Sequence, residues 1–516
     1  MSFAAPRDVL SARAERFGDR LALTEGSRTL THRELSEAAD LLAAALLERG
    51  GVSDLASGLD GERIAILVEP GIDWVVALWG VWRAGGIAVP LCVSHPVPEL
   101  LHALGDSEPS LLLASSALEE RARTAARGGD VEVRLVGELA AGAASPTETS
   151  PLRDRAERGA LIVYTSGTTG GPKGALHTHA SLSAQVDALL EAWGWSRDDR
   201  TVNVLPLHHV HGIVNVVCCA LASGARCEMM PGFDPGAIWE RFAARELTVF
   251  MAVPTIYARL VAAWEAAGAT ERERWRSGAR TLRLMVSGSA ALPGSVLERW
   301  ERATGHRLLE RYGMTETGMI LSNPLDGERV PGAVGRPLPG VEVRFAGGGE
   351  PFVESDDPKA LRGEVEVRGP GLFRGYWGRE EATREAFTAD GWFRTGDVGV
   401  LEHDRYRLLG RSSVDILKTG GYKVSALEIE EVLRAHPRIA EVAVVGIPDE
   451  EWGQRIAAAV VLCDRGSLEL DELREWSKQR LAPYKAPSLL RIVDRLPRNA
   501  LGKVTKNMVQ ELFGEG

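Results

Sequence analysis

Short apolar runs alternate with longer helix-like segments over the first three hundred residues of the chain. Residues 63–70 and 86–93 are apolar runs of strand length, and the Ala-, Val- and Trp-rich segment 74–85 between them suits a helix. Upstream, Thr31 and Glu34 have the spacing of a capping box, which marks the start of another helix. Strands that alternate with helices predict an α/β fold, with mixed or parallel sheets flanked by helices.

The pattern changes in the second half of the chain. Between residues 332 and 374, short strand-like runs are separated by Gly- and Pro-rich turns such as Gly369-Pro370-Gly371. Such closely spaced turns are typical of short strands. We therefore predict a small β-rich subdomain within a large N-terminal domain that covers residues 1–410.

A separate C-terminal domain is predicted for residues 411–516, a length usual for one domain. Ser425 and Glu428 again have the spacing of a capping box, ahead of apolar residues at helical intervals. The predicted elements that follow are strands at 442–446 and 456–462 and a helix at 470–479. Their order predicts a small α+β domain.

The composition is that of a globular protein, with 45% hydrophobic and 25% charged residues among 516. The net charge of −11 argues against a general nucleic-acid-binding protein, which would need a basic surface. Five cysteines without a Cys-x-x-Cys pair predict neither a disulfide framework nor a zinc site. No apolar run reaches the roughly 18–20 residues of a membrane span, and the N-terminus lacks a secretory signal. We expect a cytoplasmic enzyme without nucleic-acid or membrane partners, as a monomer or small homo-oligomer.

A loop rich in glycines and hydroxyls follows the apolar run at residues 161–164 and ends in a lysine. Its composition suits a polyphosphate, because glycines allow close approach of backbone amides and the lysine adds a positive charge. It is not a Walker A loop, since Gly174 rather than Ser or Thr follows the lysine. A solvated turn between two strands is an equally good interpretation of the loop alone. Its candidate residues are Thr165, Ser166, Gly167, Thr168, Thr169, Gly170 and Lys173.

Three histidines, His208, His209 and His211, lie close together before a buried apolar run. No cluster of Asp, Glu or Cys accompanies them, which disfavours a metal site. We expect His209, His211 and Asn215 to line a pocket instead.

Five motifs carry a resemblance to a known superfamily. They lie at residues 164–173, 312–316, 391–397, 410–421 and 497–503. Their order and approximate spacing resemble those of adenylate-forming enzymes, which include acyl- and aryl-CoA synthetases, peptide-synthetase adenylation domains and firefly-type luciferases. The resemblance spans nearly the whole chain, and five motifs in register are far more specific than any single one.

The resemblance implies an enzyme that uses ATP, Mg²⁺ and coenzyme A. A carboxylate attacks the α-phosphorus of ATP to give an acyl-adenylate and pyrophosphate, and a thiol then displaces AMP. The phosphate loop is expected to hold the pyrophosphate. Residues assigned to catalysis by the resemblance are Thr165, Lys173, His209, Glu316 and Lys503, with Glu316 and Thr165 as metal ligands.

The resemblance also assigns the binding residues. Asp397, with Arg411, is expected to bind the ribose hydroxyls, and the turn at residues 288–290 with Tyr312 is expected to hold adenine. The full set of implied binding residues outside the phosphate loop is Ser287, Gly288, Ser289, Ala290, Glu310, Arg311, Tyr312, Gly313, Met314, Thr315, Asp397, Arg411, Lys418, Gly420 and Gly421, together with His211, Asn215 and Arg329 for the acid.

The resemblance further implies a mobile C-terminal domain. Its rotation withdraws Lys503 after adenylation and brings the loop at residues 418–424 to the CoA channel. Between Arg411 and this loop the chain departs from many relatives, because Ser412-Ser413-Val414-Asp415 stands where they have a charged pivot. Asp415 is the nearest charged candidate for the pivot.

The motifs around Gly288, Tyr312 and Gly421 are very similar to those of malonyl-CoA synthetases. A buried second carboxylate needs a partner, and a bidentate arginine is the usual one. Arg329 is the leading candidate, although a solvent-exposed loop arginine beside Glu328 is nearly as good an interpretation. We expect ligation of malonate or methylmalonate to CoA. The alternatives are a CoA ligase for another short-chain or aryl acid, an adenylation enzyme that loads a carrier protein, and a non-catalytic ATP-binding protein.

Overall fold

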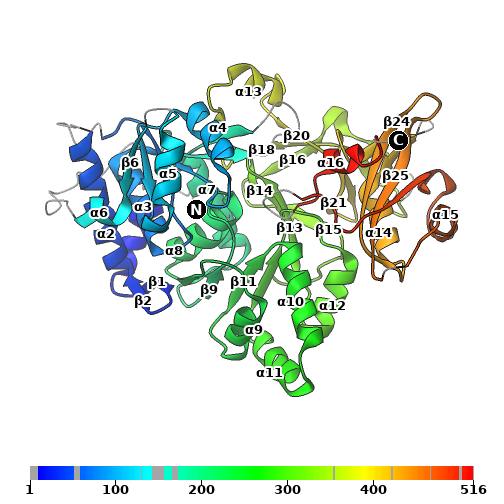
Figure 1. The fold of residues 1–516 in the computed structure, drawn as a ribbon, viewed down its shortest axis with the longest axis horizontal. Coiled ribbons are helices and arrows are strands. Elements are labelled where there is room, and N and C mark those ends of the chain that lie inside the picture. Colours follow the sequence, from blue (N-terminus) through cyan, green and yellow to red (C-terminus); the bar gives the residue numbers. More distant parts are fainter. Residues whose placement is uncertain are drawn as a thin grey trace.

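A computed structural model describes most of the chain (Figure 1). The described residues are 10–50, 58–128, 131–141, 156–165, 172–351, 355–419, 422–464, 466–498 and 503–514. Within them no helix is both long and apolar enough to cross a bilayer. The α/β fold class predicted from the sequence is confirmed, with sheets of mixed and parallel strands, covering helices and a smaller C-terminal part.

The first large sheet has seven strands in the order β19-β8-β7-β4-β3-β5-β6. Five of them run parallel, joined by helices such as α3 (Ile72–Ala84), and α3 packs against α2 (His32–Arg49). The strands are β3 (Arg63–Leu67), β4 (Ile87–Pro90), β5 (Leu111–Ala114), β6 (Glu132–Leu135), β7 (Gly159–Thr165), β8 (Lys173–Thr178) and β19 (Gly375–Tyr376). The predicted capping box at the start of α2 is confirmed, since Thr31 and Glu34 each bond the other's backbone N–H.

A four-stranded sheet in the order β2-β1-β10-β9 lies beside it. Its strands are β1 (Leu21–Glu25), β2 (Arg28–Thr31), β9 (Arg200–Asn203) and β10 (Arg226–Met229). Between β9 and β10 runs the buried π-helix η3 (His211–Cys218), which continues into α8 (Cys219–Ser223) and contacts α7 (His179–Ala192). This π-helix contains His211 and Asn215, two of the residues predicted to line a pocket.

A ten-stranded sheet begins with three parallel strands and continues antiparallel. Its strands are β11 (Val249–Ala252), β12 (Leu284–Ser287), β13 (Leu309–Met314), β14 (Gly318–Ser322), β15 (Ala333–Pro337), β16 (Glu342–Phe345), β17 (Glu350–Pro351), β18 (Leu361–Arg368), β20 (Phe393–Glu402) and β21 (Arg405–Arg411). The predicted β-rich segment exists, but it is not a separate sheet. Backbone pairing of β14 with β15 joins it to the parallel strands.

The C-terminal part has a five-stranded sheet of its own, drawn in orange and red in Figure 1. Its elements are β22 (Ile416–Thr419), β23 (Tyr422–Ser425), α14 (Ala426–Arg434), β24 (Ile439–Asp449), β25 (Gly453–Leu462), α15 (Leu470–Lys478), β26 (Leu489–Ile492) and α16 (Lys506–Glu511). Helix α14 contacts β21, the last strand of the ten-stranded sheet along the chain, so this part lies against that sheet.

Three helices below the parallel strands of that sheet pack through indole rings. Trp239 of α9 (Pro235–Ala243) stacks on Trp275 of α11 (Ala269–Ala279), with ring centroids 5.4 Å apart, and on Trp300 of α12 (Gly294–Thr304) at 5.6 Å. Stacked, buried aromatic rings contribute strongly to the stability of a hydrophobic core. This packing fixes α12, whose N-terminus faces the C-terminal part.

Gly278→Ala is expected to destabilise this helix layer. A Cβ at Gly278 would lie 2.0 Å from the backbone oxygen of Phe242, so α11 and α9 must separate, at a cost of about 1–3 kcal/mol. Gly105→Ala in α4 (Val97–Ser107) is the control, because a Cβ there meets nothing within 4 Å and alanine favours the helix. Thermal unfolding should show a lower midpoint for the first variant only. Equal midpoints would show that the layer tolerates the extra methyl group.

Candidate active site

The phosphate loop lies between two strands, β7 and β8, which pair in the antiparallel direction. Thr165 at the end of β7 is the register partner of Lys173 at the start of β8, and its hydroxyl donates to the Lys173 backbone oxygen at 3.3 Å. Ser166, Gly167, Thr168, Thr169 and Gly170 lie outside the described residues. The hairpin thus holds a hydroxyl and an ammonium group side by side at the base of the loop.

Tyr376 connects Lys173 with Glu316. The Lys173 ammonium lies 5.1 Å from the centre of the Tyr376 ring, and the Tyr376 hydroxyl donates to Glu316 Oε1 at 2.9 Å. Burial raises the pKa of the Glu316 carboxyl, which favours its neutral form until a cation is nearby. Tyr376 is a site residue that the sequence analysis missed, because it lies in no motif and reaches the site through pairing of β19 with β8.

Asp397 and Arg411 face each other across β20 and β21. Arg411 Nε donates to Asp397 Oδ1 at 3.0 Å, and the Tyr312 hydroxyl donates to Asp397 Oδ2. Burial and the Asp397 charge raise the pKa of Tyr312, so it stays a hydrogen-bond donor. These contacts fix the orientation of the carboxylate.

Arg311 is buried behind the turn that ends β12. Its side chain points from β13 toward Ser289, and Arg311 Nη2 donates to Ser289 Oγ at 3.4 Å. Only 3% of Arg311 is exposed, while its Nε and Nη1 atoms have no hydrogen-bond partner. Burial lowers the pKa of this guanidinium to about 9. The unpartnered donors of a buried guanidinium suit an anion.

The histidine segment reaches the same place. His211 Nδ1 and Ser289 Oγ are 3.1 Å apart, and burial together with the charges of Arg311 and Lys503 lowers the pKa of His211 well below its usual range. Polar atoms of His209, His211 and Asn215 are buried without a hydrogen-bond partner. Among the described residues no group of His, Cys, Asp or Glu has the arrangement of a metal site. His211 thus lies beside Arg311, with His209 and Asn215 close to it along the chain, and the pocket that these side chains are expected to line stays a prediction.

Lys503 reaches the same region from the C-terminal part. It keeps contact with solvent, yet the surrounding protein and the charges of Arg311 and Arg411 lower the pKa of its ammonium group, against the opposite effect of Asp397. Lys503 in turn lowers the pKa of His209. Positive groups thus converge near Asp397, which suits a reaction between anions.

The structure does not bring Arg329 together with these residues, and its role as the carboxylate clamp stays a prediction. Its guanidinium donates to three backbone oxygens, those of Pro324 at 3.2 Å, Leu325 at 2.6 Å and Arg307 at 2.8 Å. Each of its three nitrogens thus donates one hydrogen bond, and together these bonds tie the loop after β14 to the segment just before β13. The solvent-exposed alternative is incomplete, because Arg329 is half-buried.

The other predicted residues have different surroundings. Glu310 is buried and its Oε1 accepts from the Gly332 backbone N–H at 3.1 Å; burial raises the pKa of this carboxyl to about 7. The Thr315 backbone oxygen contacts His177 Nε2 at 2.8 Å, and Ala290 is exposed. The remaining residues are Ser287, buried with an unpartnered hydroxyl, Gly288 beside Arg311, Gly313 and Met314 at the end of β13, exposed Lys418, and Gly420 and Gly421 outside the described residues.

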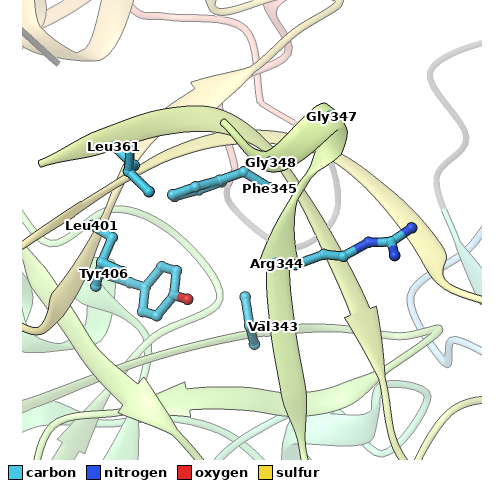
Figure 2. A pocket seen from close by; sticks show the side chains of 8 residues that line it. All are labelled: Val343, Arg344, Phe345, Gly347, Gly348, Leu361, Leu401 and Tyr406. Carbon is cyan, nitrogen blue, oxygen red and sulfur yellow. The ribbon is translucent and has the colours of Figure 1, made fainter. Parts of the chain in front are cut away.

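A hollow in the ten-stranded sheet is separate from this site. Figure 2 shows the rings of Phe345 and Tyr406 on its sides, with Arg344 pointing away toward its carboxylate partners Glu366 and Asp390. The lining residues are Val343, Arg344, Phe345, Gly347, Gly348, Leu361, Leu401 and Tyr406. None of the predicted site residues lines it.

Comparison with known protein families identifies the chain. The family described as AMP-binding enzyme matches residues 10–377. This chain belongs to the AMP-binding enzyme family. The C-terminal domain of the same family matches residues 428–503 of this AMP-binding enzyme. Both matches include residues that converge on the pocket, Lys503 among them.

Proteins and solved structures that are similar to this AMP-binding enzyme include malonate–CoA ligases. The mitochondrial malonate–CoA ligase ACSF3 of Mus musculus is 45% identical over 98% of this chain and 90% of its own. A solved malonyl-CoA ligase ternary product complex with methylmalonyl-CoA and AMP is 39% identical, with a TM-score of 0.66, and the match covers 96% of this chain and 99% of that one.

The arrangement of this AMP-binding enzyme resembles a nucleotide-bound relative. ATP-bound MatB from Rhodopseudomonas palustris is 32% identical with a TM-score of 0.86, and the match covers 98% of this chain and 99% of that one. The apo form of the same protein, at the same identity and coverage, has a TM-score of 0.77. Since both forms are MatB, the difference reflects arrangement rather than similarity of sequence.

Proposed function

We propose that the protein is an AMP-forming malonate–CoA ligase, which converts malonate, ATP and CoA to malonyl-CoA, AMP and pyrophosphate. The observation that supports it is the buried Arg311 guanidinium, whose Nε and Nη1 have no protein partner beside the pocket. The names of the relatives point the same way, since proteins 45% identical over nearly the whole chain are malonate–CoA ligases. Methylmalonate is the next candidate acid.

Arg311 takes the place that the sequence analysis gave to Arg329. A second carboxylate that enters a buried pocket loses its hydrogen bonds to water. A guanidinium replaces them with two parallel charged hydrogen bonds. His209, His211 and Asn215 supply further polar atoms without adding charge. A monocarboxylic acid would leave the guanidinium unpaired, so the pocket favours dicarboxylates.

In the first half-reaction, Lys503 is placed to bind the reacting carboxylate and the α-phosphate together. Its ammonium group and the nearby Arg411 offset the charge of two anions that must approach each other. Thr165 and Lys173 hold the pyrophosphate at the base of the phosphate loop, and Asp397 accepts the ribose hydroxyls. The buried Glu316 carboxylate fits a hard cation such as Mg²⁺, which would neutralise phosphate charge when bound.

In the second half-reaction, the CoA thiol attacks the acyl carbonyl and AMP leaves. We propose that the C-terminal domain then turns, so that Lys503 leaves the pocket and the hairpin of β22 and β23 faces the acyl group. Lys418 on this hairpin is exposed and available for the new contact. The proposed domain boundary is near residues 410–411, where the ten-stranded sheet ends at Arg411 and the C-terminal sheet starts at Ile416. A cytoplasmic location and a monomer or small homo-oligomer stay predictions, and relatives named as mitochondrial leave the compartment open.

Carboxylate-dependent pyrophosphate release tests the function. Malonate should give the highest kcat/KM, methylmalonate a lower one, and acetate, a long-chain acid and benzoate values at least about 100-fold lower, because they leave Arg311 unpaired. Adding CoA should yield malonyl-CoA and AMP. Preference for a monocarboxylate would contradict the proposed substrate. Adenylation without any thioester would favour an enzyme that loads a carrier protein, and no turnover with any acid would favour a non-catalytic protein.

A further inference from the structure

One hydrogen bond crosses from the C-terminal helix α14 to α12 of the N-terminal part. The Gly294 N–H, the first of α12, donates to Glu431 Oε1 at 2.9 Å. Pro293 precedes this N–H and gives α12 no side-chain cap. The carboxylate therefore satisfies a free amide and offsets the partial positive charge of the helix N-terminus from another domain.

Gly294 makes this approach sterically possible. A Cβ at residue 294 would lie 2.7 Å from Glu431 Oε1, closer than the two atoms can approach. Any side chain at this position must therefore displace the carboxylate. The contact depends on a residue from each domain, and each can be changed separately.

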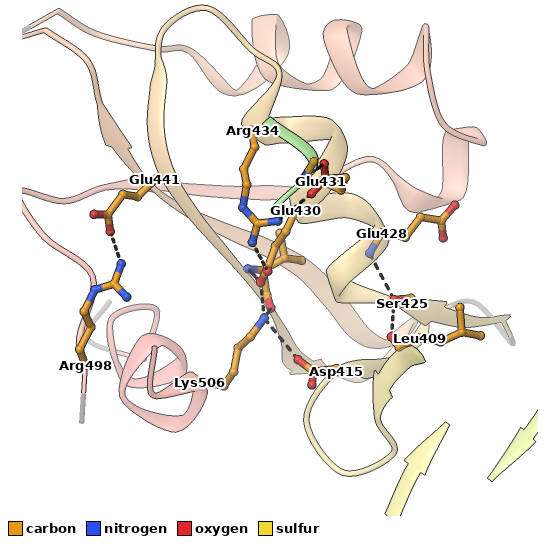
Figure 3. A network of polar contacts seen from close by, with 12 residues as sticks. Leu409, Asp415, Ser425, Glu428, Glu430, Glu431, Arg434, Glu441, Arg498 and Lys506 are labelled. Atoms are coloured by element: carbon orange, nitrogen blue, oxygen red, sulfur yellow. Dashed lines mark hydrogen bonds and ion pairs between the residues drawn. The ribbon is translucent and has the colours of Figure 1, made fainter. Parts of the chain in front are cut away.

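A chain of charges continues from Glu431 into the C-terminal domain (Figure 3). Arg434 Nη1 is 3.2 Å from Glu431 Oε2, and Arg434 Nη2 donates to Glu430 Oε2 at 2.9 Å. The other oxygen of Glu430 accepts from Lys506 and from the Val444 N–H. The signs alternate, so each charge is held between opposite charges.

The chain ends at the segment between the domains. Lys506 Nζ lies 3.4 Å from Asp415 Oδ1, and Asp415 Oδ2 accepts from the Arg411 N–H at 3.1 Å. Lys506 is three residues beyond Lys503 and begins α16, and it also donates to the Val444 oxygen at 2.7 Å. Three features thus share one network: the contact to α12, the interdomain segment and the base of the loop that presents Lys503.

We propose that Glu431 is a positioning residue that holds the C-terminal domain in the arrangement for adenylation, with the charge network transmitting this position to Lys503. The inference rests on the proposed function, since it assigns a step within the same reaction. The Glu431 side chain is 48% exposed, so water can replace its single bond to α12 when the domain turns. Glu430, at 5% exposure, and Lys506, at 14%, are more buried and form the lasting part of the network.

The test uses full-length Glu431→Ala and Gly294→Ala. Each variant removes the contact from one side, so each should lower the single-turnover rate of malonate-dependent pyrophosphate release about five- to ten-fold. Thioester formation from supplied malonyl-adenylate should stay within two-fold of the unchanged protein. The double variant should be no slower than the slower single variant, because both substitutions break the same contact. Glu431→Gln keeps an acceptor oxygen, so its rate of pyrophosphate release should lie between those of Glu431→Ala and the unchanged protein.

Two matched controls separate the contact from general damage. Glu450→Ala removes an exposed glutamate of the same domain, and Gly268→Ala adds a Cβ before α11 that meets nothing within 4 Å. Both should keep the full adenylation rate. Equal losses in the two half-reactions, additive effects in the double variant, or no effect of either variant would overturn the inference. If another acid proves to be the substrate, the same two half-reactions are measured with that acid. A wrong malonate assignment is then distinguished from a wrong role for the contact between Glu431 and Gly294.

Discussion

Replacing Arg311 with methionine should lower kcat/KM for malonate by at least about 30-fold. The substitution removes a buried charge pair with the second carboxylate, which is worth about 2–5 kcal/mol, and about 1.4 kcal/mol corresponds to ten-fold. Methionine keeps much of the volume, so the pocket retains its walls. The measurement is steady-state pyrophosphate release with malonate and with butyrate. Malonate activity should fall while butyrate activity stays or rises, since an unpaired buried guanidinium no longer opposes an apolar chain.

Arg329→Gln is the matched control for this prediction. Arg329 holds backbone oxygens of a loop rather than the pocket, so its loss should reduce thermal stability and leave the malonate KM within two-fold. A raised KM for malonate in this variant, with normal kinetics in Arg311→Met, would return the clamp to Arg329. Equal loss of malonate and butyrate turnover in Arg311→Met would show a general role of Arg311 in folding.

Lys503→Ala should reduce adenylate formation by about 1,000-fold and leave the second half-reaction nearly intact. The ammonium group is placed among Arg311, Arg411 and Asp397, where the carboxylate and α-phosphate are expected to meet. Removing one such electrostatic donor typically costs 10²- to 10³-fold in rate, and a full positive charge lies at the upper end. Single-turnover pyrophosphate release measures the first step, and thioester formation from supplied malonyl-adenylate measures the second.

Lys478→Ala is a suitable control, because Lys478 lies in the last turn of α15, outside the site. It should leave both half-reactions unchanged. If Lys503→Ala slowed both steps equally, Lys503 would serve the structure of the C-terminal domain rather than adenylation alone.

Sequence patterns predicted a local structure correctly where residues of a single short segment form all of its contacts. The capping box of Thr31 and Glu34 needs only four consecutive residues, and it forms as predicted. The box at Ser425 forms only in part: Ser425 accepts from the Glu428 N–H, but the Glu428 carboxylate contacts Lys485 Nζ at 2.8 Å. A lysine 57 residues away competes for the same carboxylate, and nothing in the local sequence indicates it.

The difference between contacts within one segment and contacts between distant segments also explains which site residues could be predicted. Asp397 and Arg411 lie in motifs, and a direct cross-strand pair brings them together. The choice between Arg311 and Arg329 depends on which guanidinium keeps nitrogens without a protein partner, a property of the folded chain. Arg311 was already among the predicted binding residues, but no group was assigned to it. Tyr376 became visible only through the pairing of β19 with β8.

The contact between Gly288 and Arg311 constrains how this enzyme can evolve toward other acids. A Cβ at Gly288 would lie 2.6 Å from Arg311 Nε, so residue 288 cannot enlarge while the arginine is present. Losing the arginine first opens room for an apolar acyl chain and releases residue 288 to vary. A laboratory lineage selected for longer acids should therefore acquire its substitutions in that order, with changes at 288 neutral or beneficial only in descendants that already lack Arg311.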